Sequence, residues 1–215
     1  MPISFINQRN PRLYLASRSP RRRELLTQIG VQFDTIVFRD PPREDKELDE
    51  TPLAGESAVA YVERVARAKA EHGWRIVGWR KLVAQPILSA DTALEFDGAI
   101  IGKPVNSDDA HAILRRLSGK THRVLTSVAV AFDGRIESLL SVSEVRFGEL
   151  DDDEIRRYVA SGEPMDKAGA YGIQGHAGLF VEQLLDIRMP EKVFHHILTF
   201  LDGLNILQRK HNPSS

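Results

Sequence analysis

Apolar residues recur along the chain with two different periods, which predicts an alternation of strands and helices. Leu13 to Ala16 is a short apolar run typical of a buried strand, and Ser19-Pro20 behind it is typical of a helix start, with a hydroxyl N-cap before proline. The same patterns predict strands at 12–17, 33–38, 86–90, 93–96, 99–101, 124–132, 135–147 and 180–185, and helices at 20–29, 57–72, 107–117, 151–162 and 190–201.

The 215 residues are enough for one sizeable α/β domain or two small lobes. Two stretches lack either period. Residues 39–56 are rich in proline, aspartate and glutamate, and residues 163–175 are rich in glycine and alanine. A long acidic loop is often functional, and a glycine-rich loop brings the backbone close to a neighbour. We expect one domain over 12–207, with flexible termini at 1–11 and 208–215.

Charge and cysteine usage exclude several classes of protein. The net charge of −1 implies no bulk attraction to nucleic acid or to an anionic membrane. The absence of cysteine excludes disulfides, thiol catalysis and thiolate metal sites, and it fits a cytoplasmic protein. We see no apolar run near the ~18–20 residues of a membrane span, no signal peptide, and neither a Rossmann nor a P-loop motif.

The first candidate site is the turn from Ser17 to Arg23. Ser17, Ser19 and three consecutive arginines, among them Arg21 and Arg22, lie at a predicted helix N-terminus. Free backbone N–H groups and the helix dipole favour an anion there, and guanidinium groups suit phosphate oxygens. The alternative is a solvated helix face, but cations in a first turn are unfavourable by ~0.3–1 kcal/mol each.

Other charged residues are candidates that each have an ordinary alternative. Asp91-Thr92 follows a buried strand, where a carboxylate acts as a general base, a metal ligand or a simple loop cap. Lys103 follows a hairpin strand, and the alternative to a role in a site is an ordinary surface lysine. Lys69 lies among alanines and either snorkels or points into a site. Arg64 is five residues before Lys69, so the two need not share a function.

The acidic loop adds one more candidate. Asp49-Glu50 would supply carboxylates for Mg²⁺, although a solvated charge run is the simpler interpretation. Taken together, arginines at a helix start, two lysines and two or three carboxylates suit the binding of a polyphosphate with a divalent metal. Attack of water on phosphorus needs such positioning and charge neutralisation.

Several motifs, in order, resemble the Maf family of nucleoside triphosphate pyrophosphatases over roughly residues 12–183. The matching segments are 16–22, 48–57, 63–70, 89–92, 102–104, 117–122 and 163–175. The resemblance implies an α/β fold with a central mixed twisted sheet flanked by helices, two lobes around a deep cleft, and a homodimer. It also implies cleavage of a nucleoside triphosphate to the monophosphate and pyrophosphate with Mg²⁺ or Mn²⁺, in the removal of excess or modified nucleotides.

The resemblance also implies roles for individual residues. Asp91 corresponds to the catalytic proton acceptor, and Glu50 to an acidic residue on the metal side together with Asp91. Cations that hold the phosphates are Arg22, Lys69 and Lys103, and the turn contributes Ser17 and Ser19. The positions tied to substrate choice are Arg21, Thr92 and Gln174.

Gln174 points to one branch of the family. The Gly-Ile-Gln-Gly form resembles the branch acting on dTTP and UTP, and an amide has the donor and acceptor to bind a pyrimidine edge. The alternatives are a 7-methyl-GTP pyrophosphatase and a nucleotide-binding inhibitor of septum formation without turnover.

Three positions depart from the family pattern. Arg18 and Ser127 stand where the family usually has glycine, and 183–194 replaces a segment containing Gly-Leu-Pro. If position 18 needs a positive φ, arginine is strained there; if not, it adds a cation near the phosphates.

Overall fold

The structure is a computed structural model that describes residues 12–36, 38 and 48–186. Within those residues the chain forms one seven-stranded mixed sheet with the order β2-β1-β3-β5-β6-β7, and β4 pairs with β3 beside this path. The strands are β1 (Arg12–Leu15), β2 (Gln32–Thr35), β3 (Ile87–Phe96), β4 (Ala99–Ile101), β5 (Thr121–Phe132), β6 (Arg135–Phe147) and β7 (Val181–Asp186). The predicted α/β class and mixed sheet are confirmed, whereas the two lobes and cleft stay a prediction.

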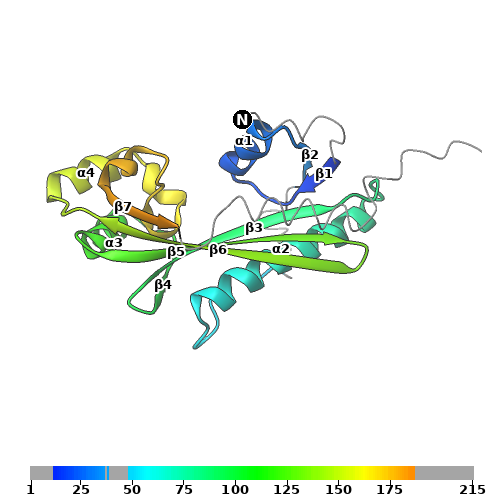
Figure 1. Cartoon of the computed structure of the whole chain (residues 1–215), viewed down its shortest axis with the longest axis horizontal. Helices are drawn as coiled ribbons and strands as arrows, with labels where there is room; N and C mark the ends of the chain where they lie inside the picture. The colour runs from blue at the N-terminus through cyan, green and yellow to red at the C-terminus, as the bar shows by residue number, and fades with distance from the viewer. Residues whose placement is uncertain (1–11, 37, 39–47, 187–215) are drawn as a thin grey trace, which may run out of the picture.

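Helices pack around the long strands β3, β5 and β6 (Figure 1). They are α1 (Pro20–Gln28), α2 (Ala58–Trp79), α3 (Ser107–Leu117) and α4 (Asp152–Ala160). In Figure 1, α1 lies with β1 and β2 near one end of the long strands, and α3 and α4 lie with β7 near the other. Helix α2 packs against β3, β5 and β6. β1 runs parallel to β2 and β3, and the other strand pairs are antiparallel.

Local signals placed most of these elements correctly. Both predicted hairpins turn at Asp-Gly pairs, Asp97-Gly98 and Asp133-Gly134, in which every residue has a positive φ. Gly30 follows α1 with a φ of 74°, as a C-terminal glycine should. Asp151 opens α4 with a full capping box.

The predicted end of the second helix at residue 72 is wrong. Helix α2 continues for seven more residues, through Gly73 to Trp79. A Cβ at Gly73 would lie 2.7 Å from Cγ2 of Ile87 on β3. Glycine therefore serves here for close packing of helix on sheet rather than for termination.

The predicted break after residue 90 is also wrong. β3 runs without interruption from Ile87 to Phe96 and pairs with β5 along nearly its whole length. Asp91 therefore lies inside the strand and not beyond its carboxyl end. A charged residue is tolerated there because Lys69 of α2 neutralises it.

The glycine-rich stretch 163–175 is confirmed as neither regular helix nor strand. It contains the short 3₁₀ turns η2 (Glu163–Asp166) and η3 (Ala168–Ala170), and η4 (His176–Phe180) follows. The predicted helix 190–201, the segment 187–207 of the predicted domain, and the predicted flexible termini lie outside the described residues. Among the described residues, no helix is long and apolar enough to cross a membrane.

Candidate active site

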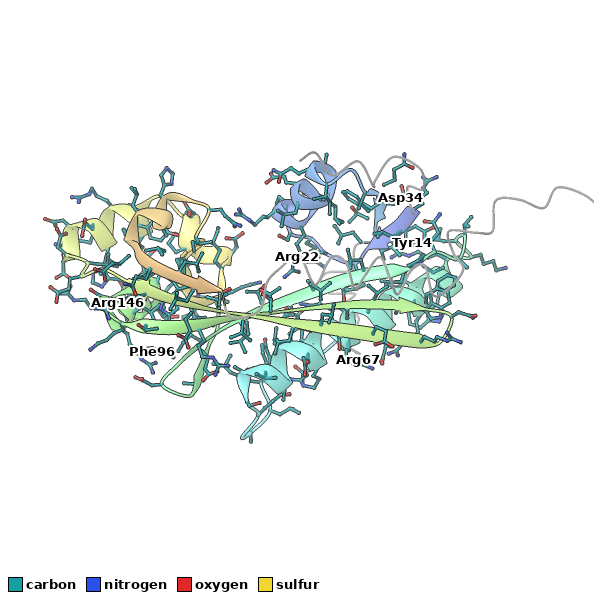
Figure 2. All side chains as sticks on the ribbon, viewed as in Figure 1. Tyr14, Arg22, Asp34, Arg67, Phe96 and Arg146 are labelled. Atoms are coloured by element: carbon teal, nitrogen blue, oxygen red, sulfur yellow. The ribbon has the colours of Figure 1, made fainter. Side chains whose placement is uncertain are left out.

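The site lies at a gap in the edge of β3. β1 pairs with β3 only as far as Leu88, and β4 begins to pair at Leu94. β5 pairs with the other edge of β3, so β1 and β4 lie along the same edge. On that edge, no described strand pairs with residues 89–93. The Arg22 guanidinium reaches this gap from α1 and donates from Nη1 to the carbonyl of Ala90 at 2.6 Å (Figure 2).

Two carboxylates meet one ammonium beside this gap. Lys69 Nζ lies 2.7 Å from Oδ1 of Asp91 and 3.0 Å from Oε2 of Glu50. The side chains of Lys69 and Asp91 are only 12% and 11% exposed, whereas that of Glu50 is 48% exposed. Lys69 thus points into a site, and Glu50 belongs to that site rather than to a solvated charge run.

The turn before α1 is held by Ser17 rather than by Ser19. The Ser17 hydroxyl accepts from the backbone N–H of Ser19 at 3.2 Å and from Arg22 Nη1 at 3.3 Å. Ser19 occupies the N-cap position, but its side chain makes no capping bond, so the prediction of a hydroxyl cap is wrong. Proline at the first helical position sets the backbone without it.

The environment of Arg22 links it to the carboxylates. Burial lowers the pKa of the Arg22 guanidinium, and the negative charges of Asp91 and Glu50 oppose that shift. Arg22 therefore lies within the electrostatic influence of Asp91 and Glu50, the two carboxylates that Lys69 contacts.

Thr92 and Arg21 are next to Asp91 and Arg22 in the sequence, but their side chains do not bond to Asp91, Lys69 or Glu50 within the described residues. The Thr92 hydroxyl lies 3.0 Å from that of Thr126 on β5, and alternation places it on the face of β3 opposite Asp91. Arg21 is half-buried, and its Nε is buried without a hydrogen bond in the described structure.

Lys103 and Gln174 lie on the segments near α3 and α4. Gly102, next to Lys103, accepts a backbone bond from Gly169 at 2.9 Å, and Lys103 lowers the pKa of Asp166 as a minor influence beside the Lys167 hydrogen bond. Gln174 is exposed on a turn closed by a bond from Gly175 to Gly172. Within the described residues, neither contacts Asp91 through a hydrogen bond or ion pair.

Arg18 is accommodated without backbone strain. It is not among the residues with a positive φ, and its Nη2 donates to the carbonyl of Phe38 at 2.6 Å. The glycine that the family usually has here is therefore not required by the local conformation.

Arg64 has a role that its spacing from Lys69 did not indicate. Its guanidinium forms a bidentate pair with Glu56, at 2.7 and 2.8 Å, and also donates to the carbonyls of Asp49 and Thr51. The signal was available, because helical side chains lean toward the N-terminus and Arg64 lies two turns into α2, within reach of the preceding loop.

The donor set suits a hard divalent cation. Glu50 and Asp91 present carboxylate oxygens around one cationic centre, and Mg²⁺ binds through one or two carboxylates plus phosphate oxygens and water. No cluster of three histidine, aspartate or glutamate ligands exists among the residues described. The site thus fits a metal that arrives with a phosphorylated ligand better than a closed structural metal site.

Several known proteins are similar to this chain over most of its length. The relative from Dechloromonas aromatica (strain RCB), named dTTP/UTP pyrophosphatase, is 72% identical over 173 residues, covering 80% of this chain and 86% of its own. A relative of the same name from Aromatoleum aromaticum is 62% identical and covers 80% of this chain and 84% of its own length. Another, from Chromobacterium violaceum, is 51% identical and covers 80% of this chain and 83% of its own length.

Among solved structures, the Staphylococcus aureus Ham1 protein covers 90% of this chain and 99% of its own at a TM-score of 0.49 and 13% identity, too distant to bear on function. The family model of the Maf-like proteins matches residues 12–187. With most of its length matched by that model and with relatives of such high identity, this chain belongs to the Maf family.

Proposed function

We propose that this protein is a dTTP/UTP pyrophosphatase, which hydrolyses the nucleoside triphosphate to the monophosphate and pyrophosphate. The observation that carries the proposal is the convergence of Asp91, Glu50 and Lys69, with Arg22 beside them at the open edge of β3. The names of the relatives at 51–72% identity supply the substrate class.

In this proposal Asp91 is the general base. Its Oδ1 accepts from Lys69, which fixes the carboxylate so that it can take a proton from a water aimed at the α-phosphorus. Water attacks, the bond between the α-phosphorus and the bridging oxygen breaks, and pyrophosphate leaves. In this proposal Arg22, Lys69 and Lys103 hold phosphate oxygens and offset charge on the leaving group.

Glu50 and Asp91 would hold the divalent metal, Mg²⁺ or Mn²⁺. When bound, the metal supplies neutralisation of phosphate charge. Substrate choice is proposed for Arg21, Thr92 and Gln174. The exposed Gln174 amide has both a donor and an acceptor, which suits the edge of a pyrimidine.

The test is pyrophosphate release from a panel of dTTP, UTP, purine nucleoside triphosphates and 7-methyl-GTP, with Mg²⁺ or Mn²⁺. We expect turnover of dTTP and UTP, and a fall in kcat of about 10²–10⁴-fold in Asp91→Asn because the general base is lost. The matched control is Asp97→Asn, since Asp97 is exposed at a hairpin turn whose positive φ asparagine adopts easily.

Other outcomes would favour the alternatives. Turnover confined to 7-methyl-GTP would place the chain in the other enzyme branch. Nucleotide binding without pyrophosphate release, unchanged in Asp91→Asn, would contradict the proposal and favour a nucleotide-binding inhibitor of septum formation.

We also propose a homodimer in the cytoplasm. Light scattering on the purified protein would then give about twice the chain mass of 24.1 kDa.

A further inference from the structure

The start of α2 holds the loop that carries Glu50 by its backbone. Arg64 donates to the carbonyls of Asp49, at 3.2 Å, and Thr51, at 3.0 Å. Between them, the Tyr61 hydroxyl donates to the carbonyl of Glu50 at 3.0 Å. Three consecutive carbonyls of the loop are thus bound by side chains of one helix.

Arg64 is itself fixed by the end of the same loop. Its Nε and Nη2 contact the two carboxylate oxygens of Glu56, and Glu56 Oε2 also accepts the backbone N–H of Leu53. The guanidinium hydrogen bonds, with Leu53 next, lower the pKa of Glu56 to about 2. The pair is therefore fully ionised at any pH where nucleotide hydrolysis would be assayed.

The Glu50 side chain has little packing of its own. It is 48% exposed, and among the described residues its carboxylate is held at one point, by Lys69 Nζ at 3.0 Å. An exposed side chain on a loop keeps a fixed position only if its backbone is fixed, so the carbonyl contacts at 49–51 decide where the carboxylate lies.

We propose that Arg64 is a positioning residue that sets the Glu50 carboxylate against Lys69 and Asp91. It acts through the loop 48–56 and does not itself contact the substrate. The effect of Arg64 on hydrolysis rests on the function proposed above. Its effect on the order of the loop 48–56 does not depend on that function.

Hydrogen–deuterium exchange tests the ordering of the loop without any turnover. In Arg64→Ala we expect exchange in peptides covering 48–57 to rise about tenfold or more, because the segment opens locally. The control is Arg67→Ala, which removes a guanidinium from the same helix (Figure 2); Arg67 bonds to Ser138 of β6 and not to the loop. Equal exchange in Arg64→Ala, Arg67→Ala and the unsubstituted protein would overturn the proposal.

A kinetic cycle tests whether Arg64 acts through Glu50. Arg64→Ala should lower kcat/KM and weaken activation by Mn²⁺ by about 10–100-fold, as loss of a residue supporting a metal ligand does. In a Glu50→Gln background the same substitution should change kcat/KM less than about threefold, because the two act as a unit. Effects that multiply in the double variant would overturn the proposal.

Two further results keep the outcomes distinct. If Arg64→Ala does not fold, Arg64→Lys replaces it; lysine keeps the charge but lacks the bidentate fork, and an intermediate exchange rate is expected. Absence of pyrophosphate release by the unsubstituted protein would contradict the proposed function alone, and the exchange measurement would then decide the role of Arg64.

Discussion

Individual side chains at the centre of the sheet differ in how well their polar atoms are paired. The Ser89 hydroxyl donates to the carbonyl of Ala66 at 2.6 Å. The Ser127 hydroxyl lies opposite Asp91 in the β3–β5 register, is fully buried, and has no hydrogen bond in the described structure. A buried hydroxyl without a partner costs about 1–3 kcal/mol. Ser127 stands where the family pattern has glycine, and glycine would carry no such hydroxyl.

At this scale we predict that Ser127→Ala raises the free energy of unfolding by about 1 kcal/mol, because only the unpaired hydroxyl is removed. Urea denaturation measures the change, and kcat/KM for dTTP should stay within about twofold of the unsubstituted value, since no interaction with a reacting group is lost. The matched control is Ser89→Ala, which should lower stability by about 0.5–1.5 kcal/mol because it removes the hydrogen bond to the Ala66 carbonyl. A loss of stability in Ser127→Ala would mean that the hydroxyl has a partner.

At the scale of elements, helix α2 supplies the side chains that hold the loop 48–56 and that contact Asp91. Its N-terminal half presents Tyr61 and Arg64 to the loop, and Lys69 near its middle contacts Asp91 of β3. Its C-terminal half contains two glycines in different surroundings. A Cβ on Gly73 would strike Ile87, whereas a Cβ on Gly78 would meet nothing within 4 Å.

These surroundings predict opposite effects of the same substitution. Gly73→Ala should destabilise the protein by about 1–3 kcal/mol, because the added methyl overpacks the interface between α2 and β3. Gly78→Ala should stabilise it by up to about 1 kcal/mol, since alanine is the better helix former and nothing obstructs it. Thermal unfolding of both variants gives the comparison; equal shifts in Tm would contradict the close approach at Gly73.

At the scale of the whole molecule, buried contacts tie the 163–176 segment to the sheet. His122 of β5 is fully buried, and its Nε2 lies 2.7 Å from the Tyr171 hydroxyl. Phe147 contacts both rings edge to face. Glu163 then closes the segment on itself through His176, at 2.8 Å from Nδ1. The turn that carries Gln174 is thereby held between a buried core and the hydrogen bond between Glu163 and His176.

Burial lowers the pKa of His122 to about 4, from an ordinary value of 6.5. Between these values the unfolded chain binds a proton at His122 that the folded chain does not, so the free energy of unfolding falls as the pH falls from 6.5 to 4. The contribution is at most about 3 kcal/mol. Urea denaturation at several pH values should therefore show a shallower loss in His122→Gln than in the unsubstituted protein. Parallel pH profiles would contradict a neutral buried histidine.

The sequence alone determined those features that depend on neighbouring residues. The Asp97-Gly98 and Asp133-Gly134 turns, the acidic start of α4 and the alternation of strands and helices all follow from local conformation, capping and periodicity. The motifs also singled out Asp91, Lys69, Glu50 and Arg22, which the structure brings together. The metal, the oligomeric state and the catalytic or binding role of each site residue stay predictions.

The contacts between elements that are distant in the sequence follow only from the tertiary structure. β3 continues through Asp91 because Lys69, 22 residues away in sequence, neutralises the carboxylate inside the sheet. Residues 89–93 of β3 have an open edge because β1 pairs with β3 only up to Leu88 and β4 pairs with it only from Leu94. No local sequence pattern indicates where these pairings stop and start. The lean of helical side chains puts the loop within reach of Arg64, but only the folded structure shows which carbonyls of the loop it binds, those of Asp49 and Thr51. Charge pairing and strand pairing join distant residues, so their effects are settled when the chain folds and not by the order of its residues.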